Sequence, residues 1–148
     1  MTVMELLKKG TVNEIVKYFS NKVNDLCFKP QKICLELKES QEMKILTYYW
    51  IYILSQDTYR FDGRNEYSSQ VGKKLYQIPF IKEQIDYLLI YSDEKMKLVA
   101  EKMSYEHRTL QQSFSSIIFY HLFITCNDNQ QIYLKENFEK EFFLTPLI

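Results

Sequence analysis

Glycine and proline are both scarce in this sequence, which has 148 residues and three of each. An all-β chain needs frequent Gly-rich turns between its short strands, so this scarcity argues against a sandwich or a barrel. It also argues against Gly-rich phosphate-binding loops, and neither GxGxxG nor GxxxxGKS/T occurs. The composition therefore favours long helices joined by short polar turns.

Cysteine is as rare as glycine, and the three thiols form no CxxC pair. The odd count of Cys27, Cys34 and Cys126 predicts reduced thiols in a cytoplasmic protein, and a single Cys27–Cys34 disulfide remains an alternative. The spacings from Cys27 to Cys34 and from His121 to Cys126 do not match those of structural zinc sites. We therefore expect no metal and no cofactor.

Arginine is scarce as well, since only Arg60, Arg64 and Arg108 contribute to the 19 basic residues. Nineteen acidic residues balance them, and the formal net charge is zero. A protein that binds nucleic acid without sequence preference gains its affinity from an excess of Lys and Arg over phosphates. The charge thus argues against broad binding to polyanions and leaves only a local basic patch open.

Long apolar runs are also missing. The longest spans residues 45–54 and is interrupted only by Thr47, whereas a helix that crosses a bilayer needs about 20 apolar residues. The N-terminal residues contain no apolar run of signal-peptide length. We therefore expect a cytoplasmic protein that makes no membrane contact.

Aromatic residues are abundant by contrast, with twelve Tyr, ten Phe and one Trp. The apolar content of 46% and the charged content of 26% are usual for a soluble domain. A chain of this length buries roughly 68–70% of its unfolded surface, which is enough for a core without metals or disulfides. A single domain over 1–148 is expected.

Capping signals and hydrophobic periodicity predict helices along most of the chain. Over 11–28, Thr11 and Glu14 have the spacing of a capping box, and apolar residues recur at helical intervals. Further helices are predicted over 1–9, 40–55, 68–78, 80–91 and 92–103, from Ser104 or Glu106 to Thr125, and over 131–143 after a turn at 127–130. The predicted fold class is all-α: a single-domain irregular bundle of five to seven helices, with its core drawn from 12–28, 43–54, 81–91 and 110–124.

Two segments leave helix and strand open. Over 32–38 apolar and polar residues alternate as in a strand, but Pro30 and the apolar pair Ile33 and Leu37 suit a short helix, so the strand stays an alternative. The segment 45–54 is rich in residues that favour strands. However, Ser40 is a suitable N-cap, and the capped segment is longer than most strands. We expect 45–54 to form the central helix, with Trp50 in the core.

The sequence around each of the two histidines predicts a different environment for its side chain. His121 lies on the apolar face of its helix, so we expect a core histidine bonded to a neighbouring Tyr or carbonyl; Ser115 falls on the polar face. His107 lies between Glu106 and Arg108, and these three residues could supply acid–base groups of an enzyme site. No catalytic motif supports that alternative, and we expect no enzyme and no catalytic residue.

Protein recognition remains as the leading hypothesis, because Tyr, Trp and Arg offer large rigid contact areas with a polar group. We expect a small non-enzymatic protein-binding module (an inhibitor, immunity factor, adaptor or assembly subunit) that binds another protein or itself as a homodimer. The predicted contact surface is the 56–67 loop with two nearby lysines: Tyr59, Arg60, Asp62, Arg64, Tyr67, Lys73 and Lys74. The alternative is a nucleic-acid-associated helical protein that uses Arg60, Arg64, Lys73 and Lys74.

Overall fold

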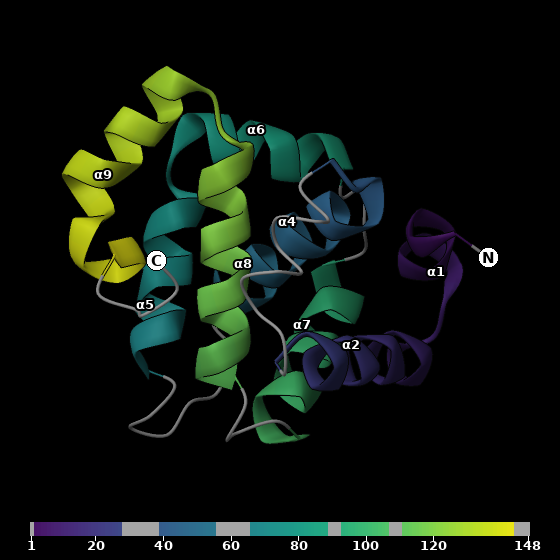
Figure 1. Cartoon of the computed structure of the whole chain (residues 1–148). Helices are drawn as coiled ribbons and strands as arrows, with labels where there is room; N and C mark the ends of the chain where they lie inside the picture. The colour runs from purple at the N-terminus through teal and green to yellow at the C-terminus, as the bar shows by residue number, and fades with distance from the viewer. Residues whose placement is uncertain (1, 28–38, 56–65, 89–92, 107–110, 144–148) are drawn as a thin grey trace.

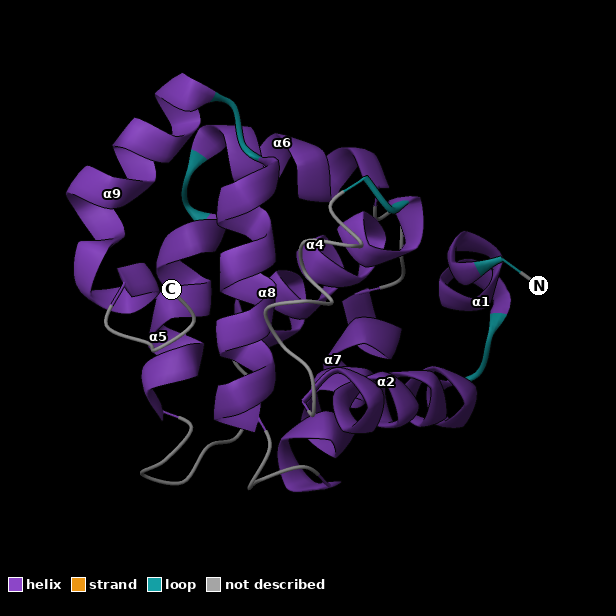
Figure 2. Cartoon of the chain, in the orientation of Figure 1, coloured by secondary structure: helices purple, strands orange, loops and turns teal. Residues whose placement is uncertain are grey.

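A computed structural model describes residues 2–27, 39–55, 66–88, 93–106 and 111–143, and within these ranges every regular element is an α-helix (Figures 1 and 2). The helices are α1 (Val3–Lys9), α2 (Val12–Cys27), α4 (Gln41–Ser55), α5 (Glu66–Tyr76), α6 (Pro79–Leu88), α7 (Asp93–Glu106), α8 (Gln111–Thr125) and α9 (Asp128–Phe143). The all-α prediction is confirmed. The eight described helices exceed the predicted number of five to seven, although each of them lies on a segment for which the sequence predicts a helix. The segment 32–38 lies outside the described residues.

Helix α4 contains the ambiguous segment 45–54 and is the centre of the bundle (Figure 1). It begins at Ser40, whose Oγ accepts a hydrogen bond from the Met43 amide at 3.3 Å. Ten of its fifteen residues are buried, and it packs against α5, α6, α7 and α8. A helix satisfies its backbone groups internally, so it can be covered by neighbours on every side. The helix prediction for this segment is therefore confirmed against its strand propensity.

An aromatic cluster joins α4 to α2. The Phe19 ring stacks on Tyr49 at 4.7 Å between centroids and lies 6.0 Å from Trp50. All three side chains are fully buried. The indole N–H of Trp50 donates to the Ser115 hydroxyl on α8 at 3.0 Å, so the largest core side chain also has its polar atom satisfied. The predicted core position of Trp50 is confirmed.

A second buried polar contact between α4 and α8 involves His121, which is fully buried as predicted. Its Nδ1 lies 2.9 Å from Thr47 Oγ1, and that hydroxyl donates its own proton to the Met43 carbonyl at 2.8 Å. Thr47 must therefore accept from His121, which places the shared proton on Nδ1. The described contact of Nδ1 is with a threonine hydroxyl, and the tyrosine or carbonyl partner expected from the sequence stays a prediction.

Ser115 corrects the predicted polar face of α8, because its side chain is fully buried. Its small hydroxyl is the acceptor for the Trp50 indole, so the core gains from burying it. The start of this helix also differs from the prediction. Ser104 and Glu106 belong to α7, and α8 begins only at Gln111.

Two helix starts follow the capping-box pattern, and the sequence revealed only one of them. Thr11 and Glu14 exchange hydrogen bonds with each other's amides at 3.0 and 3.2 Å, as predicted. Asn127 and Gln130 do the same at 3.0 and 2.9 Å. The predicted turn at 127–130 is therefore the cap and first turn of α9, which begins at Asp128 and not at Gln131.

Glu42 couples α4 to α2 and gives the protein a testable pH dependence. Its carboxylate lies 2.6 Å from Lys22 Nζ and accepts a 2.7 Å hydrogen bond from the Tyr18 hydroxyl. The Lys22 contact, followed by the Tyr18 bond, lowers the pKa of Glu42 below its usual 4.5. A carboxyl whose pKa is lower in the folded state than in the unfolded state stabilises the fold. This stability is present above the pKa of the unfolded state and is lost as the pH falls through the pKa of the folded state.

We therefore expect Glu42→Gln to lower the free energy of unfolding at pH 7 by about 0.3–1 kcal/mol, a small effect because the pair is partly exposed. Denaturant unfolding of both proteins at pH 7 and near pH 3 measures this. The difference between them should shrink at the acidic pH. An equal difference at both pH values would show that the carboxylate charge is not its source.

Candidate functional site

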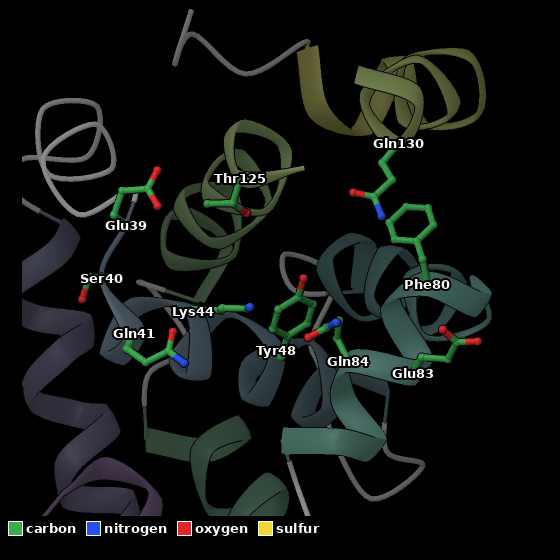
Figure 3. A pocket seen from close by; sticks show the side chains of 10 residues that line it. All are labelled: Glu39, Ser40, Gln41, Lys44, Tyr48, Phe80, Glu83, Gln84, Thr125 and Gln130. Atoms are coloured by element: carbon green, nitrogen blue, oxygen red, sulfur yellow. The ribbon is translucent and has the colours of Figure 1, made fainter. Parts of the chain in front are cut away.

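A cavity of about 420 Å³ opens where α4, α6, α8 and α9 meet (Figure 3). Most of its lining side chains carry amides, hydroxyls or charges. The lining residues are Glu39, Ser40, Gln41, Lys44, Tyr48, Phe80, Glu83, Gln84, Thr125 and Gln130. Cavities of this volume are typical of small-ligand sites, although those are usually more apolar.

One face of α4 forms the floor of the pocket. Gln41, Lys44 and Tyr48 follow one another at intervals of three and four, which places them on the same side of a helix. This side is directed toward the polar pocket at the N-terminal half of α4, while the C-terminal half is buried among other helices. The pocket therefore begins at the capped end of the central helix.

The facing wall comes from the outer side of α6. Proline at the first position of this helix has a backbone geometry that suits a helix start. Ile81 and Ile85 are buried and attach α6 to the core. Phe80 and Gln84, four residues apart, consequently share another side of the helix and reach the pocket together (Figure 3).

The α8–α9 junction closes the remaining side. Gln131 Nε2 donates to the Phe123 carbonyl at 2.9 Å, which ties α9 to the last turns of α8. The Gln130 Oε1 accepts from the Asn127 amide, so the carbonyl of this side chain is occupied by the cap. Its Nε2 remains and points toward Phe80 at the pocket (Figure 3). Gln130 therefore caps α9 and lines the pocket at once.

Tyr48 is the most deeply placed side chain of the pocket, with 8% of its surface exposed. Its hydroxyl is directed into the cavity, and it forms no hydrogen bond to any residue that the structure describes (Figure 3). Burial, with a smaller contribution from nearby Cys126, raises the pKa of Tyr48 to about 12. The hydroxyl is therefore protonated at neutral pH and can donate a hydrogen bond to a ligand.

Burial also raises the pKa of the Cys126 thiol to about 11. At neutral pH this group is a thiol, and the thiolate that acts as a nucleophile is scarce. Cys126 is free of disulfide bonding, which agrees with the prediction for this residue. Cys27 is the last residue of α2, and Cys34 lies outside the described residues.

Charges are unevenly placed around the cavity. Lys44 is the single cation among the ten lining residues, and within the described ranges its ammonium has no ion-pair partner. Glu39 and Glu83 are both exposed, and the Glu83 carboxylate is turned away from Tyr48 (Figure 3). The positive charge therefore lies inside the pocket, and the negative charges lie at its margin.

Aromatic side chains border the pocket on α6 and α9. Phe80 meets Tyr133 edge to face, with 6.2 Å between ring centroids. Tyr133 is 43% exposed, and Tyr87, three residues beyond Gln84 on α6, is 80% exposed. We call Phe80, Tyr87 and Tyr133 the aromatic rim. Ile132, beside Tyr133 on α9, adds a further exposed apolar side chain.

The surface predicted from the sequence is mostly outside the described residues, as are Tyr59, Arg60, Asp62 and Arg64. Tyr67 lies in α5, and Lys73 and Lys74 are exposed near the end of that helix. None of them lines the pocket. This surface therefore remains a prediction.

The alternative enzyme site also remains a prediction. Glu106 is the last residue of α7, and His107 and Arg108 follow it in a segment that the structure does not describe. The ten lining residues of the pocket do not include these three.

Comparisons of the chain with family models, curated proteins and solved structures find no match. Among the described helices, none is long and apolar enough to cross a bilayer. Within the same residues, no group of three or more His, Cys, Asp or Glu side chains is arranged to hold a metal ion. The pocket and its aromatic rim are thus the features on which a functional proposal can rest.

Proposed function

We propose that this protein is a non-enzymatic protein-binding module whose contact surface is the pocket and the aromatic rim. The observation that carries the proposal is the exposure of Tyr87 and Tyr133 on α6 and α9, two helices that line a cavity of about 420 Å³. Inhibitors, immunity factors, adaptors and assembly subunits are roles that such a module fills. The bound partner is another protein or a second copy of this chain.

Two physical arguments support recognition of a protein at this surface. Aromatic residues are enriched at the centres of interfaces, since each buries a large area and loses little side-chain entropy. The Phe80 contact holds the Tyr133 ring in place before any partner binds. Such preorganisation lowers the entropic cost of association. The adjoining pocket can admit a side chain of the partner as an anchor.

Paired double variants separate the aromatic rim from the loop surface predicted by the sequence. Tyr87→Ala with Tyr133→Ala removes exposed rings and leaves the core unchanged. Lys73→Ala with Lys74→Ala removes the described charges of the alternative surface. In affinity capture from the native host, followed by calorimetry with the captured partner, we expect the first pair to weaken binding at least about tenfold. The lysine pair should bind nearly as wild type.

Loss of binding in the lysine variant alone would show that the contact surface lies in the 56–74 region and not at the aromatic rim. Sizing of the isolated protein tests the homodimer, which the aromatic variant should dissociate. A monomeric elution together with no specific partner would contradict the proposed function.

A further inference from the structure

The inner end of the pocket gathers hydrogen-bond donors that have no acceptor among the described residues. The Tyr48 hydroxyl, the Lys44 ammonium and the Gln84 side chain form no hydrogen bond or ion pair to any part of the chain that the structure describes. Tyr48 is more than nine-tenths buried, and its hydroxyl faces the open part of the cavity (Figure 3). A ligand with acceptor oxygens would supply these donors with a partner.

We propose that this end of the pocket binds a carboxylate group, with Lys44 and Tyr48 as its principal donors. The inference rests on the proposed function: the carboxylate belongs to the bound partner, as its chain terminus or as an Asp or Glu side chain. An ionised carboxylate is an acceptor only and has two oxygens, so it can accept from the ammonium and from the phenol together.

Lys44 and Tyr48 are placed to act on one group. They are four residues apart on α4, so their side chains lie on the same face of the helix. Figure 3 shows the Lys44 side chain extending toward Tyr48 and the Tyr48 hydroxyl directed into the open part of the cavity. Gln84 reaches the same region from α6 and can donate from its amide.

The position at the start of α4 favours a negative charge. The N-terminus of a helix carries a partial positive charge, which stabilises anions close to its first turn. The Met43 amide is already satisfied by Ser40 Oγ, so the cap itself needs no ligand. That hydroxyl accepts in the cap and retains its proton for donation into the pocket.

The carboxylates at the margin of the pocket distinguish between anions of different charge. With Lys44 positive and Glu39 and Glu83 negative, the lining has a formal charge of −1. A dianionic phosphate would be repelled by Glu39 and Glu83 more strongly than a singly charged carboxylate. The cavity is also larger than a carboxylate, and Phe80 forms an apolar part of its wall. A carboxylate attached to a longer organic group fits better than a small inorganic ion.

Titration of the isolated ¹⁵N-labelled protein tests this assignment by NMR. The probes are N-acetylglycinate, which mimics a chain terminus, and N-acetylglutamate α-amide, which presents only a side-chain carboxylate. We expect at least one to shift the amide signals of residues 40–48 and 84 saturably, with a Kd on the order of 1 mM. The stronger probe identifies the source of the carboxylate. Neutral N-acetylglycinamide should cause no comparable shifts.

Two variants test the named donors. Lys44→Met and Tyr48→Phe should each weaken binding of the stronger probe about tenfold, the loss expected for one hydrogen bond to a charged group. Lys73→Met is the matched control, because it removes an exposed charge outside the pocket and should leave the Kd unchanged. Helical circular dichroism of all three variants verifies that they remain folded.

Three results would overturn the assignment: no shifts with either carboxylate, equal shifts with the neutral probe, or tighter binding of inorganic phosphate. Because these titrations use no partner, their failure leaves the proposed protein-binding function standing. That function fails separately, if the protein elutes as a monomer and captures no specific partner.

Discussion

Trp50→Ala is expected to lower the free energy of unfolding by about 3–5 kcal/mol, the usual cost of truncating a large core aromatic. Trp50 is fully buried at the contact of α2, α4 and α8. Its removal leaves a cavity beside Phe19 and leaves the Ser115 hydroxyl without its indole donor. Since a domain is stable by only about 5–15 kcal/mol, this loss is a large share of the total.

Denaturant unfolding followed by circular dichroism measures the effect, because the variant lacks the chain's one tryptophan and cannot be followed by its fluorescence. Ser115→Ala isolates the polar part, since it leaves the buried indole N–H without this acceptor, and it should cost about 1–3 kcal/mol. Tyr87→Ala is the surface control and should stay within about 0.5 kcal/mol of wild type. A Trp50→Ala loss as small as the control's would contradict the placement of α4 at the centre.

Gly72→Ala is expected to destabilise the protein by about 1–3 kcal/mol through overpacking, even though alanine is the better helix former. Gly72 lies in the middle of α5, where a β-carbon would approach Leu54 Cβ of α4 to 2.5 Å. That atom is fixed to the backbone of the central helix, so relief of the clash requires α4 and α5 to separate. The packing cost should therefore exceed the gain in helix propensity, which is about 1 kcal/mol.

The matched control is Lys73→Ala, the adjacent exposed position on the same helix, which should change stability by less than about 0.5 kcal/mol. Thermal and denaturant unfolding of both variants provide the comparison. If Gly72→Ala proves more stable than wild type, propensity dominates at this position, and the close approach of α4 and α5 is not as tight as described.

Local signals were sufficient for several elements. The Thr11–Glu14 box and the periodicity after it predicted α2, and the Ser40 cap predicted the start of α4. These features depend on groups within one helical turn, so a short stretch of sequence contains all the atoms involved. The Asn127–Gln130 box is equally local. The segment was predicted to be a turn because Asn and Gln were not recognised there as capping residues.

Ser115 and the pocket show the limit of local signals. The serine follows the polar pattern of its helix, yet it is buried because Trp50, 65 residues earlier, requires an acceptor there. Lys44, Gln84 and Gln130 belong to no motif, and they become one lining only because α4, α6 and α9 meet. A sequence pattern records the period of a helix but not which helix will face it.

The sequence by itself determined that this protein is all-α, with Trp50 and His121 in a core around residues 45–54, because helix formation and amphipathic burial follow from short-range periodicity and capping. Only the tertiary structure decided the buried partners of these residues and the existence of a pocket at the N-terminal half of α4. The two buried hydrogen bonds, for example, join residues that are 74 and 65 positions apart in the chain. Such contacts are set by the packing of whole helices, so no single segment of the sequence specifies them.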